Sequence, residues 1–341
     1  KMDEQDSGLL PRSISPSPPN SRQRSSILPD LNLQQPMRKT FSTRFSIKVR
    51  RNKTKQPRPS KNLSMIAESH QTQDDLRTER IQHRPRITAQ SWVVMGGKKG
   101  KILDGKDIDN PREIASLTKI MTCFVVLNEL NNHKKDLEEK ITVSKSAASM
   151  QGTSALLEAG DEGTIRDLLH GLMLPSGNDA AVALAEFIGN LLSPSSLDPV
   201  GAFVTKMNET CKLYKLTSTC FTNPHGMSTT INLSTAKNIS TLASIVCMNE
   251  QFMRIVNTQS YRCVLRNTKG NREIEWNNTN KLLKLGFSGV KTGFTPNAGP
   301  CLCSIAEKRK RKIIIVLLNS ATPGSRWSES TNLLKWASKY F

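Results

Sequence analysis

The chain has 341 residues and a formal net charge of +20, from 49 Lys and Arg against 29 Asp and Glu. Its longest apolar run, residues 313–318, is far shorter than the roughly 20 residues that span a bilayer, which excludes an integral membrane protein. The seven cysteines are odd in number and include no Cys-x-x-Cys pair, so neither a disulfide framework nor a zinc ribbon is indicated.

The N-terminal part of the chain differs in composition from the rest. Residues 1–90 hold 18 basic and 8 acidic side chains, with Phe41 and Phe45 as their only aromatics. Such a segment cannot bury enough apolar surface to offset the entropy lost on ordering. We therefore expect residues 1–88 to form a disordered Ser/Pro/Arg-rich basic tail, followed by a folded domain at residues 89–341.

This tail admits several functions besides that of a solvated extension. Its composition also fits a transit-type targeting segment, a phosphorylated docking tail or a weak binder of polyanions. The first residues, Lys-Met-Asp-Glu-Gln-Asp, lack the apolar core of a secretory signal. An intracellular or organelle-targeted protein without a signal peptide or transmembrane segment is therefore expected more than a secreted one.

Taken in chain order, apolar periodicity after residue 87 predicts a hairpin, helices, further strands and a closing helix. The hairpin consists of residues 92–95 and 101–103 around a Gly-rich turn. Helix-like spacing follows in the middle of the chain, short strand-like runs come next, and an amphipathic pattern ends the domain. The predicted helices cover residues 117–130, 165–172, 180–188 and 333–340, and the predicted strands cover residues 261–265, 273–276, 302–306 and 313–318.

Strands at both ends of the domain surround a helical middle. This order predicts an α+β fold with one mostly antiparallel sheet and a mostly helical insert.

Ser116 and Lys119 stand three residues apart on a predicted helix, so a hydroxyl and an amine project from one face. A Ser hydroxyl becomes a good nucleophile when a base takes its proton, and a Lys with a lowered pKa can be that base. Ser-x-x-Lys alone is a weak signal, because it occurs again at Ser234 and at Ser288.

Two further motifs follow Ser116 in a fixed order, which makes the combination specific. Ser176-Gly177-Asn178 comes 60 residues later, and Lys291-Thr292-Gly293 comes 115 residues after that. Ser-x-x-Lys, Ser-x-Asn and Lys-Thr-Gly in this order form the signature set of the penicillin-binding and serine β-lactamase superfamily. Only Ser116 precedes both of the other motifs.

With their neighbouring residues, these motifs resemble those of the low-molecular-mass D-alanyl-D-alanine carboxypeptidases, peptidase family S11. The resemblance covers roughly residues 89–341 and implies an antiparallel sheet flanked by helices, with the active site between the sheet and a helical insert. It implies that Ser116 attacks the carbonyl of the penultimate D-Ala, that Lys119 takes its proton, and that Ser176 relays a proton to the departing D-Ala.

The resemblance also implies how the substrate is held. Asn178 would bind the peptide, Lys291 and Thr292 would bind the substrate carboxylate, and Gly293 would let the strand approach closely. The backbone N–H groups of Ser116 and Phe294 would form the oxyanion hole. The implied partners are a peptide ending in D-Ala-D-Ala and β-lactams as covalent inhibitors, without metal or cofactor.

Simpler interpretations of single residues remain open at this point. Ser176 and Asn178 are residue types that often cap a helix, and one is predicted to begin near Asp179. His225 lies in Asn-Pro-His-Gly, a typical turn sequence, and is predicted to be structural. Thr279 occupies a position where some family members have Arg, which leaves carboxylate recognition mainly to Lys291 and Thr292.

Two other functions fit the same motifs. A β-lactamase would share all three, but no Glu-x-x-Leu-Asn of the class A type lies between Asn178 and Lys291. A non-catalytic muropeptide or polyanion-binding protein on a hydrolase fold is the second alternative, which the intact Ser, Lys and Asn residues argue against. The favoured hypothesis is a serine-type D-Ala-D-Ala carboxypeptidase.

Overall fold

The structure is a computed structural model that describes residues 78–79, 81–96, 100–228, 231–308 and 310–340. Contacts divide the chain into residues 1–68 and 69–341, and every described residue belongs to the second unit. Residues 1–77 of the predicted tail thus lie outside the described residues.

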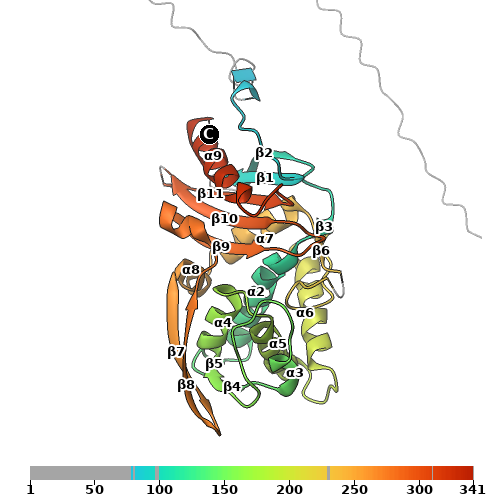
Figure 1. Ribbon diagram of the computed structural model, residues 1–341. Helices are drawn as coiled ribbons and strands as arrows, with labels where there is room; N and C mark the ends of the chain where they lie inside the picture. The colour runs from blue at the N-terminus through green and yellow to red at the C-terminus, as the bar shows by residue number, and fades with distance from the viewer. Residues whose placement is uncertain (1–77, 80, 97–99, 229–230, 309, 341) are drawn as a thin grey trace, which may run out of the picture. The chain divides into compact units, whose positions relative to one another are not determined.

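Five strands form the central antiparallel sheet (Figure 1). Their order is β2, β1, β11, β10, β9, so strands from both ends of the domain meet in the middle of the sheet. The order places the chain's apolar run in β11, where the strand is paired on both sides. The strands are β1 (Ser91–Gly96), β2 (Lys101–Lys106), β9 (Phe287–Gly293), β10 (Cys301–Lys308) and β11 (Arg311–Leu318).

Alternate side chains of these strands enter two separate cores. Ile315 and Leu317 of β11 pack with the C-terminal helix α9 (Ser325–Tyr340), whereas Ile314 and Val316 belong to the larger core on the other face. The helix α7 (Ala236–Val246) contacts β1, β10 and β11 on that second side. Burial on both faces explains why β11 is a continuous apolar run.

The helical region lies beneath the sheet in Figure 1. Its central helix α2 packs against α4, α5, α6, α7 and α8. The helices are α2 (Thr118–Asn132), α3 (Lys145–Ala148), α4 (Ile165–Met173), α5 (Asn178–Leu192), α6 (Pro199–Leu213) and α8 (Glu250–Asn257).

The structure differs from the prediction of one sheet. The strands predicted at residues 261–265 and 273–276 belong to a second, four-stranded sheet of order β4, β5, β7, β8, and β3 pairs separately with β6. The pairing of Arg266 with Glu162 joins the long β7–β8 hairpin to β5, a contact between distant parts of the sequence. These strands are β3 (Arg112–Glu113), β4 (Lys140–Thr142), β5 (Glu162–Thr164), β6 (Leu233–Ser234), β7 (Ser260–Asn267) and β8 (Gly270–Asn277).

The predicted N-terminal hairpin, all four predicted helices and the four later strands are confirmed, as is the α+β class. Short elements with weak periodicity, such as β4 and α3, went unpredicted, because three or four residues carry too little pattern. No helix in the described part of the chain is long and apolar enough to cross a membrane.

Several described residues of the predicted tail contact the domain. Arg84 forms an ion pair of 2.9 Å with Asp104 of β2. Thr88 donates from its backbone N–H and its hydroxyl to Glu329 of α9. The ring of His83 lies 6.1 Å from that of Tyr340. The tail's disorder and its boundary at residue 88 stay predictions.

Candidate active site

Ser116 and Lys119 lie where the short helix η1 (Ala115–Leu117) runs into α2. The Lys119 Nζ is 3.0 Å from the Ser116 Oγ, so the predicted proton-sharing pair is formed. At the second Ser-x-x-Lys, Ser234 instead bonds to Thr219 and Lys237 pairs with Asp109. Of these two Ser-x-x-Lys matches, only the one at Ser116 has its hydroxyl and amine hydrogen-bonded to each other.

Two further oxygens surround the Lys119 amine. Its Nζ donates to the Asn178 Oδ1 at 2.7 Å and to the backbone carbonyl of His225 at 2.8 Å. A neutral amine has two N–H groups and one lone pair, and neither of these carbonyl oxygens can donate a proton. In the neutral form these two oxygens can take both N–H groups, so the lone pair is available to the Ser116 hydroxyl, as a general base requires.

The protonation of Lys119 is controlled by its surroundings. Its side chain is fully buried, and this loss of water lowers the pKa well below the usual lysine value. The nearby positive charge of Lys291 lowers the pKa further, while Asp179 acts in the opposite direction. Burial and the like charge together favour the neutral amine.

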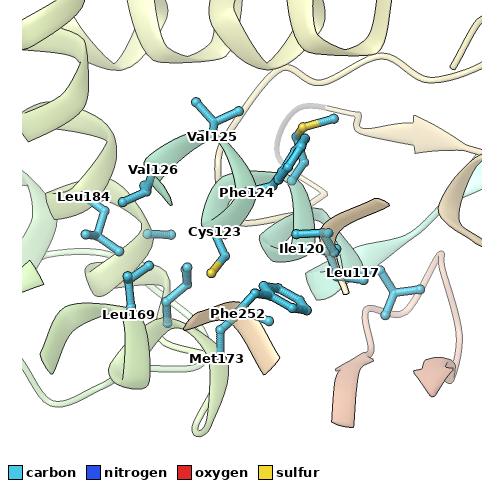
Figure 2. Close-up of a cluster of buried hydrophobic side chains, with 14 of the residues drawn as sticks. Leu117, Ile120, Cys123, Phe124, Val125, Val126, Leu169, Met173, Leu184 and Phe252 are labelled. Carbon is cyan, nitrogen blue, oxygen red and sulfur yellow. The ribbon is translucent and has the colours of Figure 1, made fainter. Parts of the chain in front are cut away.

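Side chains of α2 pack into the hydrophobic core, as Figure 2 shows. Cys123 and Ile120 of this helix are fully buried, and Phe252 of α8 packs into the same cluster. Twelve of its 15 residues are buried, so α2 has no solvent-facing side along most of its length. Because protein interiors are close-packed, this burial restricts movement of the helix that carries Lys119.

Ser176 lies in the turn between α4 and α5, and Asn178 begins α5. The Asn178 side chain accepts from Lys119 and donates to the backbone carbonyl of Gln151 at 2.7 Å. The Ser176 hydroxyl is buried and has no hydrogen-bond partner among the described residues. Gly177 is the N-cap and no side chain caps the helix. The helix-capping interpretation is therefore wrong.

Two residues of this region have an unfavourable backbone conformation. Ala115 and Ser176 have positive φ values of 48° and 72°, which are unfavourable for residues with a Cβ atom. The backbone of Gly226 passes so close to Ala115 that a Cβ at Gly226 would lie 2.0 Å from the Ala115 carbonyl oxygen. The turn containing His225 is thus pressed against η1, and this close approach brings the His225 carbonyl to Lys119.

Strand β9 supplies the third motif. Lys291 is buried, and its Nζ donates to the Thr292 carbonyl at 3.0 Å. Burial, together with the charge of Arg326, lowers the pKa of Lys291 to about 7. A Cβ on Gly293 would lie 3.0 Å from the Ile114 carbonyl oxygen and 3.1 Å from the Ser116 nitrogen. A glycine thus allows the strand to meet η1.

A cavity of about 420 Å³ opens at the meeting point of these elements. Its wall contains most of the predicted site, while Lys119 and Lys291 are buried in the protein interior. The structure therefore brings all three motifs together around one cavity. The predicted residues that line it are Ser116, Ser176, Asn178, Thr292, Gly293 and Phe294.

Sequence reasoning missed Arg326, which also lines the cavity. Its Nη1 donates to the carbonyls of Gly293 and Cys301 at 3.0 and 3.1 Å, which ties the start of α9 to β9 and β10. No motif surrounds Arg326, so only the fold reveals it. His225 was predicted as structural, and its carbonyl contact with Lys119 was not foreseen. Thr279 bonds to the Thr292 hydroxyl at 2.9 Å.

Within the described residues, no group of three or more His, Cys, Asp or Glu side chains is arranged to hold a metal ion.

Comparison with known proteins gives a family assignment. The sequence profile of peptidase S11, described as D-alanyl-D-alanine carboxypeptidase, matches residues 78–322, well over half of the chain. The chain belongs to the peptidase S11 family. The family and the fold expected from the motifs are thereby confirmed.

Several D-alanyl-D-alanine carboxypeptidases are similar to this chain in sequence. The chain is 34% identical over 277 residues to the D-alanyl-D-alanine carboxypeptidase DacF of Bacillus subtilis, covering 81% of this chain and 67% of DacF. It is 34% identical to the enzyme of Streptomyces sp. strain K15, covering 74% of this chain and 88% of that one. For DacC of Escherichia coli the identity is 30%, covering 77% of this chain and 64% of DacC.

Solved structures agree with this assignment. The DD-transpeptidase of Streptomyces K15 superposes with a TM-score of 0.70 at 35% identity, covering 74% of this chain and 98% of that one. DacD of Francisella tularensis gives 0.67 at 29% identity, covering 74% of this chain and 71% of that one. The S11 domain therefore has the fold of the serine DD-peptidases, and neither alternative function is favoured.

Proposed function

We propose that this S11 domain is a serine-type D-Ala-D-Ala carboxypeptidase that works through an acyl-enzyme on Ser116. The observation that carries the proposal is the set of contacts at the buried Lys119 Nζ, which lies 3.0 Å from the Ser116 Oγ and donates to Asn178 and to the His225 carbonyl. A buried, neutral amine within hydrogen-bond distance of a Ser hydroxyl can take its proton and so activate the nucleophile.

Acylation then proceeds in two proton transfers. Ser116 Oγ forms a bond to the carbonyl carbon of the penultimate D-Ala while its proton passes to the Lys119 Nζ. The tetrahedral oxyanion is stabilised by the backbone N–H groups of Ser116 and Phe294, contacts that cost about 3 to 4 kcal/mol when one donor is removed. As the C–N bond breaks, the proton taken up by Lys119 is relayed through the Ser176 hydroxyl to the departing amine, which leaves as D-Ala, and Lys119 is neutral again.

Deacylation returns the enzyme to its starting state. A water molecule adds to the ester carbonyl and loses a proton to the neutral Lys119 amine, and the Ser116 oxygen then leaves and takes that proton from Lys119. The products are the shortened peptide and the free enzyme, so no cofactor enters the balance.

Substrate binding rests on the charge of the cavity. Asn178 and Thr292 line the cavity and would bind the peptide and its carboxylate, while Lys291 would contribute positive potential from inside the protein. Arg326 lines the same wall, which adds a fixed cation to the side that we assign to the substrate carboxylate. β-Lactams, which carry a carboxylate and a reactive carbonyl, fit the same site as covalent inhibitors.

Intact-mass analysis after incubation with benzylpenicillin tests the nucleophile, the base and the oxyanion hole together. We expect a covalent adduct on the wild type, its loss in Ser116→Ala, and its retention in the matched control Ser288→Ala, which changes the third Ser-x-x-Lys. Release of D-Ala from a peptide ending in D-Ala-D-Ala should follow the same pattern. A folded wild-type protein without an adduct would refute the proposed chemistry.

For the tail, the composition supports two further proposals. Between residues 11 and 64 the sequence is rich in Ser and Arg, with Asp30 as its only acid. We propose that this segment binds polyanions weakly and addresses the protein to an organelle. Deleting residues 1–77 should lower affinity for duplex DNA without changing acylation, and an unchanged affinity would contradict polyanion binding by the tail.

A fluorescent protein fused behind residues 1–88 should localise to an organelle. A diffuse signal would contradict the targeting role.

A further inference from the structure

A run of five basic residues connects β10 to β11, Lys308-Arg309-Lys310-Arg311-Lys312. The four described members of the run are all exposed. The antiparallel register places Lys308 directly opposite Arg311, and Glu307 opposite Lys312. Like charges in directly opposed positions are unfavourable for strand pairing, and here they concentrate positive charge at the end of the hairpin.

The pairing of β1, β2 and β9 brings another cation and the residues before β9 to the same end of the sheet. Gly96 of β1 pairs with Ile313 of β11 on one side and with Lys101 of β2 on the other. Exposed Lys101 therefore lies in line with the start of β11. On the other flank Phe287 pairs with Ala306, so the residues before β9 approach the end of β10.

Exposed apolar side chains accompany these cations. The short helix η2 (Lys281–Leu285) precedes β9 and ends in exposed Lys284 and Leu285, the latter with 62% of its surface accessible. Met248 has 74% of its surface accessible and follows Cys247 in the chain. Burial raises the pKa of the Cys247 thiol while the positive charge of Lys312 acts to lower it, which places Lys312 near the thiol. The last turn of α7 lies beside Gly100, whose Cβ position would be 4.0 Å from the Ser244 Oγ.

These residues form one surface, which we call the basic end. Its acids are few among the described residues: Glu307 faces Lys312, and Glu250 forms a loose pair with Arg254 at 3.9 Å. The basic end consists of Lys101, Lys284, Lys308, Lys310, Arg311 and Lys312, with Leu285 and Met248 between or beside them.

We propose that the basic end docks the protein on an anionic lipid bilayer. Each Lys or Arg near such a surface is attracted by its negative potential, and apolar side chains beside the cations gain by entering the headgroup region. Nucleic-acid phosphates would use the cations but leave Leu285 and Met248 without a partner. Among the described residues, exposed Phe294 could stack on bases, and it lies at the cavity beside Ser116 instead.

The register of the sheet fixes how far the catalytic cavity would stand from the membrane. Gly293, at the cavity, pairs with Cys301 at the start of β10, and Lys308 ends the same strand (Figure 1). Seven residues of extended chain separate these two positions, a distance of roughly 24 Å. Docking through the basic end therefore leaves the cavity uncovered, and the proposal stands independently of the reaction.

Sedimentation with vesicles tests the proposal on the full-length chain, so that the tail is identical in every sample. The tip variant Lys308→Gln/Lys310→Gln/Lys312→Gln is compared with a control that removes the same charge from exposed lysines of the helical region, Lys134→Gln/Lys145→Gln/Lys212→Gln. A third variant, Met248→Ser/Leu285→Ser, removes the apolar contacts. Vesicles contain phosphatidylglycerol with phosphatidylcholine, or phosphatidylcholine alone, and duplex DNA is the rival polyanion.

We expect the tip variant to bind phosphatidylglycerol vesicles more weakly by on the order of 100-fold, with the control variant close to the wild type. Met248→Ser/Leu285→Ser should weaken vesicle binding about tenfold and leave DNA binding unchanged. Equal affinities of the tip and control variants would overturn the proposal. DNA binding that depends on the tip, with vesicle binding indifferent to Met248 and Leu285, would assign the surface to nucleic acid. Circular dichroism and thermal melting confirm that each variant is folded.

Discussion

The Nζ of Lys119 lies 2.7 Å from the Oδ1 of Asn178, and this bond joins the first sequence motif to the second across 59 residues of chain. Asn178 is neutral, so it accepts from the amine without stabilising the ammonium ion as a carboxylate would. The contact thus orients Lys119 while leaving its pKa low.

Asn178→Asp tests that distinction with almost no change in shape. A carboxylate at this position would raise the pKa of Lys119 and keep the amine protonated. We expect acylation by benzylpenicillin at pH 7 to fall by tenfold or more, and to recover in part as the pH is raised. Stopped-flow or mass-detected acylation rates between pH 5 and 10 measure this, and a rate equal to wild type at neutral pH would contradict the role assigned to Asn178.

The acylation rate of the wild type should pass through a maximum with pH. It rises as Lys119 loses its proton and falls above about pH 7, where Lys291 becomes neutral and its attraction for the substrate carboxylate is lost. The two amines titrate as a coupled pair, so the apparent values belong to both. In Lys291→Arg the alkaline limb should move to higher pH; a limb that stays in place would show that Lys291 is not its origin.

Lys291→Met should stabilise the fold and destroy activity. The folded-state pKa of Lys291, about 7, lies below that of an exposed lysine, so burying its charge costs stability in full below pH 7. The cost shrinks as the pH rises from 7 towards the unfolded value. We expect a gain of about 1 to 4 kcal/mol in the free energy of unfolding at pH 7, and less at pH 9.

Chemical denaturation at the two pH values, with acylation measured in parallel, gives both quantities for Lys291→Met. A variant that is less stable than the wild type at pH 7 would mean that the Lys291 charge is better compensated than its single bond to the Thr292 carbonyl indicates.

Gly293→Ala should separate folding from catalysis. The new methyl group would crowd the Ile114 carbonyl and the Ser116 nitrogen, forcing β9 away from η1 and spoiling the oxyanion hole. We expect acylation to fall about 100-fold, the range for loss of one oxyanion donor. Gly324→Ala is the matched control, because its nearest neighbour would be 3.7 Å away, and its rate should equal the wild type.

Ser176→Ala should leave stability nearly unchanged, because the hydroxyl it removes is buried without a hydrogen-bond partner. A helix-capping serine would instead cost about 1 kcal/mol on substitution. Acylation should fall by about 100-fold or more if Ser176 transfers a proton to the leaving group. Thermal melting and acylation rates distinguish the two roles. A destabilised Ser176→Ala variant with normal acylation would indicate a structural role for Ser176 and contradict its role in proton transfer.

Much of the site could be predicted from the sequence because its chemistry resides in ordered motifs. Ser116, Lys119, Ser176, Asn178 and the Lys-Thr-Gly run each carry a residue type that the reaction needs, and their order excludes chance matches such as Ser234. Strands and helices with strong periodicity, such as those at residues 313–318 and 117–130, were likewise predictable, since burial on a defined face imposes the pattern.

Tertiary structure alone decided the features that depend on contacts between distant segments. The His225 carbonyl reaches Lys119 because Gly226 is pressed against Ala115, and no local pattern encodes that contact. Arg326 comes to the cavity from a helix that sequence periodicity describes only as amphipathic. The second sheet depends on the single pairing of Arg266 with Glu162. Hydrophobic pattern specifies which residues are buried, whereas packing between elements specifies which polar groups they bring together.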